Sequence, residues 1–345
     1  TVKSYCGPGE GQVCAEPQAI STGDSYDIHN RAQASIIRSY TDATFETFKN
    51  QMQSIAYGSY DKFGNVLSQT IDTYTSLDPD QDFQVDHKLI ESTYSDPVAQ
   101  RRGNATQTVT TRSDKDANLI DRSTTDTTEF NAMGYAVDQV TTTEVYSSGA
   151  FVYTEKSVIH NSSIDNRGDA ETQTIKSYIT DDNGATYDIV TYQVLTNREF
   201  NSDHNVDNSM ALTYSDDSAS KILLDVTETR STGFHSSGVA LYQVVATFAD
   251  EAKTSLLDVK TIENADISLL GYVGESTVTR YSGLVAYDGE GGALDPDQAT
   301  MVDQTLTTTS SFDLRGNSLE TRTVKSYYVP GEGLVRTQAR RSPST

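Results

Sequence analysis

The amino-acid sequence predicts an all-β protein. We expect an elongated array of about eight or nine antiparallel β-hairpin repeats, with a period of about 34 residues, in a solenoid-, tube- or shell-like form. Three observations predict this fold class. An aromatic residue followed by a turn recurs along the chain, and a second turn signal lies near the middle of each period. The segments between turns are rich in Thr, Val, Tyr and Ile, which favour strands.

The repeat is clearest at Tyr60, which opens a turn with Asp61, is followed by Gly64, and is matched by a closing aromatic at Tyr74. Openings of this kind stand at Tyr26, Tyr60, Phe130, Ile164, Phe200, Phe234, Ile267 and Phe312. A degenerate copy is expected near Tyr94, and the last spacing lengthens to 45 residues. Because glycine tolerates positive φ, the turn glycines are predicted at Gly64, Gly134, Gly168, Gly238, Gly271 and Gly316.

The second turn signal falls at stretches such as Asp181-Asp182-Asn183-Gly184. One period is therefore one β-hairpin, with an incoming and an outgoing strand. Residues 41–57 carry apolar side chains at a helical spacing, but their place in the repeat predicts a strand, and we follow the repeat.

The repeat divides the chain into three parts. Residues 1–25 are a partial repeat, residues 26–311 hold about eight tandem hairpins, and residues 312–345 are a partial terminal repeat with a basic tail. Residues 1–11 and 323–333 share Thr-Val-Lys-Ser-Tyr and Pro-Gly-Glu-Gly. Two explanations stay open: the chain is one superperiod of a longer protein, or partial repeats of neighbouring subunits complete each other's sheet by strand addition.

The two cysteines, Cys6 and Cys14, lie on either side of a Pro-Gly-Glu-Gly turn. A hairpin there would bring them face to face, so we expect a disulfide and an oxidising, extracellular location. Two free thiols or an interchain bond are the alternatives. Asn104 and Asn161 begin Asn-x-Ser/Thr sequons and are candidate glycosylation sites.

Composition restricts the core and the partners. Hydrophobic residues make up 35% of the chain, Trp is absent and there are 20 Tyr, which predicts a thin core of Tyr, Phe, Val and Thr. A net charge of −23 argues against nucleic acid and anionic membrane surfaces as partners. No apolar run is long enough for a membrane span.

The sequence Leu-Asp-Pro-Asp-Gln occurs at 77–81 and again at 294–298. Because Pro cannot donate to a β-ladder, both copies are predicted to be protruding loops. Their acidic side chains are candidate Ca²⁺ ligands: Asp78, Asp80, Asp82, Asp295 and Asp297. The spacing matches no EF-hand, so we favour solvated acidic loops and no cofactor.

Catalytic residues are not indicated. His29, His204 and His235 fall in the repeat's turns, and the chain holds no Gly-x-Ser-x-Gly motif and no phosphate-binding loop. An exposed turn aspartate has no reason for the raised pKa that a general acid needs. We therefore expect no enzymatic activity.

The frame Tyr60-Asp61 with Gly64-Asn65 resembles the YD-repeat (Rhs) family of large bacterial surface and secreted proteins. Looser copies are Tyr26-Asp27 with Asn30-Arg31, Ile164-Asp165 with Gly168-Asp169, and Phe312-Asp313 with Gly316-Asn317. The resemblance implies β-hairpin sheets that spiral into a hollow shell, in some members around a toxin. The period here is longer than in that family.

A structural function follows from these features. We expect a component of an extracellular filament, stalk or sheath that assembles end to end through its incomplete terminal repeats, with other copies or further repeats of the same chain as partners. The alternatives are an adhesin or glycan-binding surface stalk, and a shell segment of an Rhs-like protein.

Overall fold

The computed structural model describes residues 2–4, 18–22, 26–40, 48–77, 83–287, 292–312, 316 and 318–343. The chain divides into two compact units. Unit 1 comprises Thr1–Gly168 and Lys176–Val190, and unit 2 comprises Asp169–Ile175 and Thr191–Thr345. Cys6 and Cys14 lie outside the described residues, so their disulfide stays a prediction.

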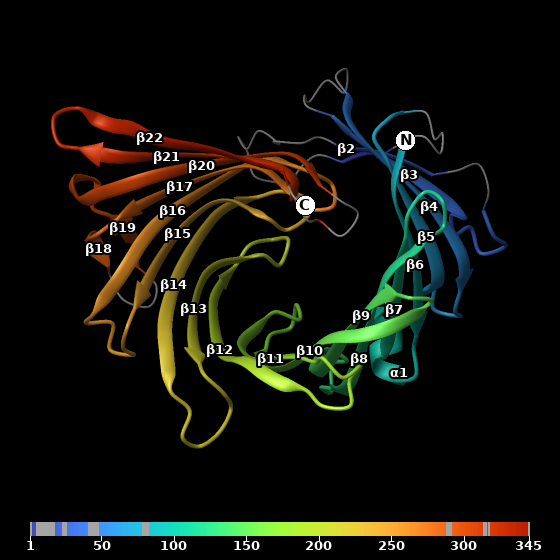
Figure 1. Ribbon diagram of the computed structural model, residues 1–345. Coiled ribbons are helices and arrows are strands. Elements are labelled where there is room, and N and C mark those ends of the chain that lie inside the picture. Colours follow the sequence, from blue (N-terminus) through green and yellow to red (C-terminus); the bar gives the residue numbers. More distant parts are fainter. Residues whose placement is uncertain are drawn as a thin grey trace. The chain divides into compact units, whose positions relative to one another are not determined.

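Unit 1 is an antiparallel sheet in which each strand pairs with the next one along the chain (Figure 1). Its strands are β1 (Val2–Ser4), β2 (Gln18–Thr22), β3 (Ala34–Tyr40), β4 (Phe48–Tyr60), β5 (Val66–Tyr74), β6 (Gln84–Thr93), β7 (Gln107–Ser113), β8 (Leu119–Phe130), β9 (Ala136–Ser147) and β10 (Ala150–Ile164).

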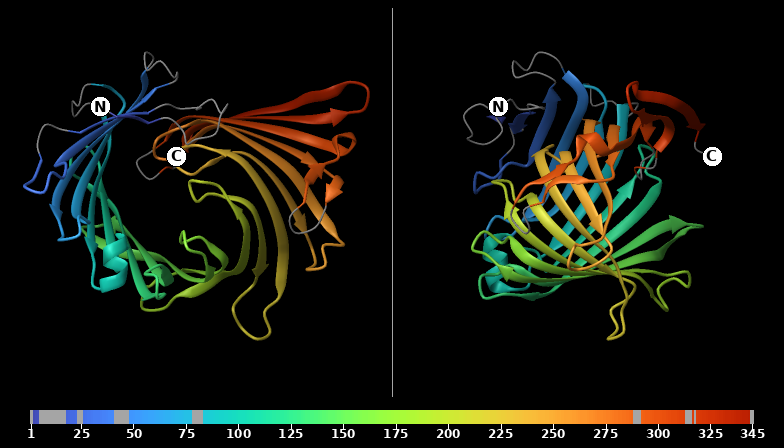
Figure 2. Two further views of the ribbon diagram at one scale, coloured as in Figure 1. Left: turned by 180° about the vertical axis from the view of Figure 1, so that it is seen from behind. Right: turned by 90° about the vertical axis from the view of Figure 1, so that its left-hand side faces the viewer.

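Unit 2 continues the same pattern, with β17 pairing β20 across an inserted hairpin (Figure 2). Two strands have residues in both units, β11 (Ala170–Ile179) and β12 (Asp188–Phe200). The others are β13 (Val206–Tyr214), β14 (Leu223–Phe234), β15 (Ala240–Phe248), β16 (Leu256–Ile267), β17 (Val273–Tyr281), β20 (Met301–Phe312), β21 (Ser318–Val329) and β22 (Gly333–Pro343). The predicted all-β series of consecutive antiparallel hairpins is confirmed.

The predicted turn frame is confirmed at the strand ends. The N–H of Gly64 donates to the carbonyl of Asp61 at 3.2 Å, and the N–H of Asp61 donates to the carbonyl of Asn65 at 2.9 Å. The Asp61 carboxylate accepts from the N–H of Phe63 and of Asn65 at 2.8 and 2.9 Å. Gly64 has φ 92°, a left-handed conformation that costs glycine little.

Two copies reach this left-handed conformation without glycine. Asn30 has φ 62° and His204 has φ 65°, each four residues after its opening. The Nδ1 of His204 lies 2.6 Å from Asp169 Oδ1, one turn earlier in the sheet. Ala117 is also left-handed, with φ 62°, and closes the turn that Asp114 begins. Nothing in the sequence indicates this conformation for an alanine.

Successive turns pack on one another. A Cβ at Gly168 would lie 2.7 Å from the Tyr135 ring, and one at Gly134 would lie 2.9 Å from the backbone nitrogen of Ala99. Glycine is therefore required at these two positions for two reasons, the positive φ and the close approach of the preceding turn.

The turn expected near Tyr94 differs from the repeat. The hairpin of β6 and β7 is present, but its connection is a short helix, α1 (Pro97–Arg102). Asp96 caps the helix by accepting from the N–H groups of Val98 and Ala99, and Gly103 ends it with φ 83°. A proline in the first turn and an Asp before it favour a helix start, which explains the departure.

The prediction of a protruding loop at 294–298 was wrong in part. Leu294–Pro296 forms the short strand β19, which pairs with β18 (Leu284–Tyr287) in a separate two-stranded sheet, and a 3₁₀ turn, η2 (Gln298–Thr300), follows. Pro296 is tolerated because it ends a short edge strand. This insertion accounts for the long last spacing. The strand predicted over 41–57 is confirmed where the structure describes it, in β4.

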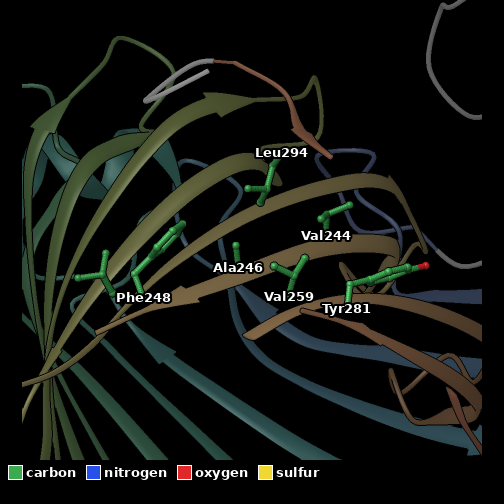
Figure 3. Packing of buried hydrophobic residues seen from close by; sticks show 7 residues of the cluster. Val244, Ala246, Phe248, Val259, Tyr281 and Leu294 are labelled. Atoms are coloured by element: carbon green, nitrogen blue, oxygen red, sulfur yellow. The ribbon is translucent and has the colours of Figure 1, made fainter. Parts of the chain in front are cut away.

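The apolar core of unit 2 is thin, as predicted. Side chains of β14 to β17 meet Leu294 of β19 on one face of the sheet (Figure 3). The buried members of the cluster are Val226, Val244, Ala246, Phe248, Val259, Tyr281 and Leu294. Each fully buried Val, Leu or Phe side chain contributes about 1.5–3 kcal/mol, so this cluster anchors the inserted hairpin on the sheet.

Replacing Gly134 by Ala tests the turn packing. The variant must adopt a left-handed alanine and push Ala99 aside, so we expect a loss of about 3 kcal/mol in the free energy of unfolding. Gly149→Ala is the matched control, because Gly149 has φ 90° but no atom within 4 Å of an added Cβ. It should lose about 1–2 kcal/mol. Urea denaturation measures both, and equal losses would contradict the packing role.

Candidate functional site

The most deeply buried side chains include charged groups, and these connect different strands and turns of the sheet. Glu228 is fully buried, Asp86 is 1% exposed and Asp303 is 2% exposed. An unpaired carboxylate at such positions would be strongly destabilising, so its partners are essential to the sheet.

Glu228 of β14 is the centre of the largest cluster. Arg198 donates from Nη1 to Glu228 Oε2 at 2.7 Å and from Nη2 to Oε1 at 3.1 Å. Arg230 donates from Nη1 to Oε2 at 3.0 Å, and Lys253 Nζ lies 2.5 Å from Oε1. Three cations thus surround one carboxylate, with a two-bond guanidinium pair that is among the strongest in proteins.

A β-bulge positions Arg198. The register of β12 against β13 shifts between Asn197 and Glu199, which leaves Arg198 as the extra residue. The same side chain donates to Oδ1 of Asn208 at 3.1 Å on its way to β14. Bulges redirect a side chain relative to its strand, which here brings a guanidinium across β13.

The inserted hairpin closes over this cluster. The hydroxyl of Tyr287, at the end of β18, donates to Glu228 Oε1 at 3.2 Å. Arg230 Nε donates to the carbonyl of Gly292 at 3.2 Å. The cluster therefore holds the β18–β19 hairpin on the sheet alongside the apolar contact of Leu294.

The electrostatics of the cluster favour ionised Glu228. Burial raises the pKa of its carboxyl group, but hydrogen bonds from Arg198, Lys253 and Arg230 outweigh burial and lower the pKa from 4.5 to about 2. For Lys253, burial lowers the pKa, but the hydrogen bonds and charges of Glu228 and Tyr287 together outweigh burial and raise it. Both groups therefore stay charged near neutral pH.

Other buried carboxylates also lie beside cations. Arg122 forms a two-bond pair with Glu144 at 2.6 and 2.8 Å, and its guanidinium lies 4.4 Å from the centre of the Phe151 ring. Asp86 is flanked by Lys88 and Arg112 at 3.3 and 3.6 Å. Asp303 is flanked by Lys325 and Arg280 at 3.2 and 3.6 Å.

An asparagine ladder also connects hairpins. Asn161, Asn197 and Asn264 each stand three residues before an opening, and their Nδ2 atoms donate to backbone carbonyls at 3.1, 3.0 and 3.0 Å. The three acceptors are alanines six residues after the preceding opening: Ala136, Ala170 and Ala240. The Asn–Ala pairing was visible in the sequence and was missed.

Lysines lie over the aromatic residues at the other end of the hairpins. Lys156 Nζ is 4.7 Å from the Tyr178 ring centre and 4.4 Å from that of Tyr187. Lys221 Nζ is 4.7 and 4.2 Å from the ring centres of Tyr192 and Tyr214. Cation–π contacts of this kind stabilise by about 0.5–1 kcal/mol each.

The structure places several of the predicted site residues. Asp295 is exposed on β19, and Asp297 accepts from the N–H of Ala299 at 3.0 Å, which caps η2. Asp78, Asp80 and Asp82 lie outside the described residues. Among the described residues, no group of three or more His, Cys, Asp or Glu could hold a metal ion. The absence of a cofactor stays the prediction, with the five aspartates as candidate Ca²⁺ ligands.

The two sequon asparagines are used in the fold. Asn104 Nδ2 donates to the carbonyl of Gly134 at 2.8 Å, and Asn161 Nδ2 donates to that of Ala136. Glycosylation at either residue stays a prediction.

Two strand histidines pair with carboxylates of neighbouring strands, whereas His235 Nδ1 lies 2.7 Å from Ser237 Oγ in its own turn. His87 Nδ1 lies 2.6 Å from Asp72 Oδ1, and His160 Nδ1 lies 2.7 Å from Asp138 Oδ1. These are cross-strand contacts of the sheet. In the part of the chain that the structure describes, no helix is long and apolar enough to cross a membrane.

No protein-family model matches the chain, and no curated protein matches it. The crystal structure of TcdB2-TccC3 is similar over 93% of this chain and 19% of that chain, with 9% sequence identity and a TM-score of 0.24. The chain thus spans about a fifth of the length of that protein.

Substituting Glu228 by Gln tests the charge cluster. The folded-state pKa is below its ordinary value, so ionised Glu228 stabilises the fold above pH 4.5 and this contribution is lost as pH falls from 4.5 to about 2. We expect the variant to lose about 3 kcal/mol at pH 7. Its unfolding free energy should also vary less between pH 4.5 and 2 than that of the wild type. Parallel pH curves would contradict the assignment.

Asn197→Ala tests the asparagine ladder. Removing the amide leaves the carbonyl of Ala170 without this donor, which should cost about 1–3 kcal/mol. Asn166→Ala, at an exposed position of the preceding turn, is a control that leaves the ladder intact. Thermal unfolding of both proteins gives the comparison, and an Asn197 variant as stable as the control would count against the ladder.

Proposed function

We propose that this chain is a structural component of an extracellular filament, stalk or sheath. The observation that carries the proposal is the use of its buried polar groups. Glu228, Glu144, Asp86 and Asp303 each pair with a cation from another strand of the sheet. Side chains of the kind that active sites commonly use are here committed to holding strand to strand.

The repeat supports the same proposal. Hairpins that contact only their neighbours build surfaces of any length and need a cap or a partner at each end. A chain of this kind serves as a rod or wall without a ligand. Its net charge of −23 keeps the faces of such an assembly apart and in solution.

The extracellular location is supported by sequence alone. A cysteine pair across a predicted turn fits an oxidising compartment. Many Ser, Thr and Asn side chains on a polar sheet fit a surface exposed to water. Self-association is the property that separates this proposal from the alternatives.

Sedimentation and electron microscopy of the purified chain test the proposal. We expect the 37.7 kDa chain to form larger particles as its concentration rises. Dispersed monomers at every concentration would contradict end-to-end assembly. A glycan array probed with the same material tests the alternative of a binding stalk, and specific hits by a monomeric chain would favour that alternative.

A further inference from the structure

Basic residues gather in the opening turns of unit 1, which lie along one edge of its sheet. The turn between β4 and β5 carries Lys62, and α1, which replaces the next opening turn, carries Arg101 and Arg102. All three side chains are exposed, and within the described part of the chain none of them forms an ion pair with a carboxylate. Lys and Arg are absent from the opening turns of unit 2 at 201–205, 235–239 and 268–272.

Apolar side chains lie beside these cations. Phe63 is 43% exposed and Val98 is 46% exposed. Lys62 Nζ and the guanidinium carbon of Arg101 lie 4.9 and 5.8 Å from the Phe63 ring centre. This edge therefore presents positive charge together with apolar surface. We call its five residues the basic edge: Lys62, Phe63, Val98, Arg101 and Arg102.

The two turns of the basic edge are fixed to each other by hydrogen bonds. Asn65 Nδ2 donates to the carbonyl of Gln100 at 2.6 Å, and Gln100 Nε2 donates to Asp61 Oδ2 at 2.8 Å. The carboxylate of Asp61 also accepts from N–H groups of its own turn, and Asp96 caps α1. The acidic side chains here are thus used inside the edge, and the cations are held in place for a partner.

The second turns, which join the other ends of the strands, are acidic in unit 2. Two neighbouring ones, at 215–222 and 249–255, each hold two adjacent acidic residues, Asp216-Asp217 and Asp250-Glu251. The lysine of each turn points back onto the sheet, one over two tyrosine rings and the other to the buried carboxylate of β14. Negative charge is therefore what these turns present outward.

This acidic side of unit 2 also carries exposed apolar residues. Ile222, Leu224 and Leu257 are 66%, 51% and 61% exposed. Leu224 and Leu257 are the extra residues of two β-bulges, where the register of β14 and of β16 shifts against the preceding strand. We call the following residues the acidic edge: Asp216, Asp217, Ile222, Leu224, Asp250, Glu251 and Leu257.

The two edges match in charge and in spacing. On each edge, neighbouring turns are one hairpin apart, which is two strand spacings or about 9–10 Å. Two acidic turns of one copy can therefore meet the Lys62 turn and α1 of another copy at the same time. Because the chain carries a net charge of −23, most other surfaces of two copies repel each other.

We propose that the basic edge of one copy of this chain binds the acidic edge of a second copy, with the apolar side chains of the two edges in contact. Each copy then keeps one edge of each charge for further copies, so the contact is head-to-tail and continues from copy to copy. The interface rests on the proposed function, because it names a contact through which a filament or sheath grows beside its strands' turns.

A charge exchange between two variants tests the pairing. One variant carries Lys62→Glu and Arg101→Glu, and the other carries Asp217→Lys and Glu251→Lys. Neither should associate alone, because like charges then face each other. Their equimolar mixture should associate again in sedimentation, because each variant supplies the intact edge that the other has lost. A mixture that stays monomeric, with both variants folded by circular dichroism and the wild type associating, would overturn the interface and leave the structural function standing.

A single substitution gives an independent readout. Lys62→Glu should raise the dissociation constant between copies about tenfold or more. Arg322→Glu is the matched control, because it makes a like change in charge at an exposed position in the middle of β21 and should leave association unchanged. Equal effects of the two substitutions would overturn the interface. A wild-type chain that is monomeric at every concentration would overturn both the interface and the proposed function.

Discussion

Contact between successive turns is the constraint on which the rest of this structure depends. A strand of alternating Thr and small polar residues specifies its register weakly, because a shift by one residue exchanges two similar faces. The turn ends remove that freedom. Gly168 fits under the Tyr135 ring, and Gly134 lies against the backbone of Ala99. The position of each hairpin is therefore fixed by contact with the hairpin before it, and this contact also fixes the register of its strands.

Hairpins positioned in this way still need stabilising contacts between the side chains of their strands, and apolar side chains are scarce. Buried ion pairs supply these contacts. Such pairs are costly to desolvate and stabilise a fold only when each charge is fully satisfied. Glu228 meets this condition with Arg198, Arg230 and Lys253, and Tyr287 adds a hydroxyl donor. Where β18 and β19 pack on the sheet, ionic and apolar contacts act on the same hairpin.

Sequence reasoning located the hairpins because turn chemistry is local. The openings at Tyr60, Phe130 and Phe234 end β4, β8 and β14, and a glycine with positive φ follows each. Ala117 was not predictable in the same way, because an alanine in this conformation is imposed by the strands on either side of it.

Most of the candidate site could not be predicted from the sequence. Arg198 reaches Glu228 only because a bulge adds one residue to β12, and a bulge is a property of pairing between strands. Leu294 lies in strand β19, which contacts the face of β15 and β16. The residues next to Leu294 in the sequence do not indicate this contact. The sequence shows that Asn197 and Asn264 stand at the same spacing before their openings. It does not show that their side chains donate to backbone carbonyls, which only the structure reveals.

The stacking of turns has a consequence for how such a chain changes length during evolution. Gly168 packs against the Tyr135 ring of the preceding turn, and Gly316 packs in the same way against the ring of Tyr272. Duplication or deletion of one complete hairpin restores this contact between the new neighbours, whereas a change by half a hairpin joins unlike ends. Recombination in whole periods is therefore tolerated, and selection can adjust the span of the molecule without redesigning any single contact.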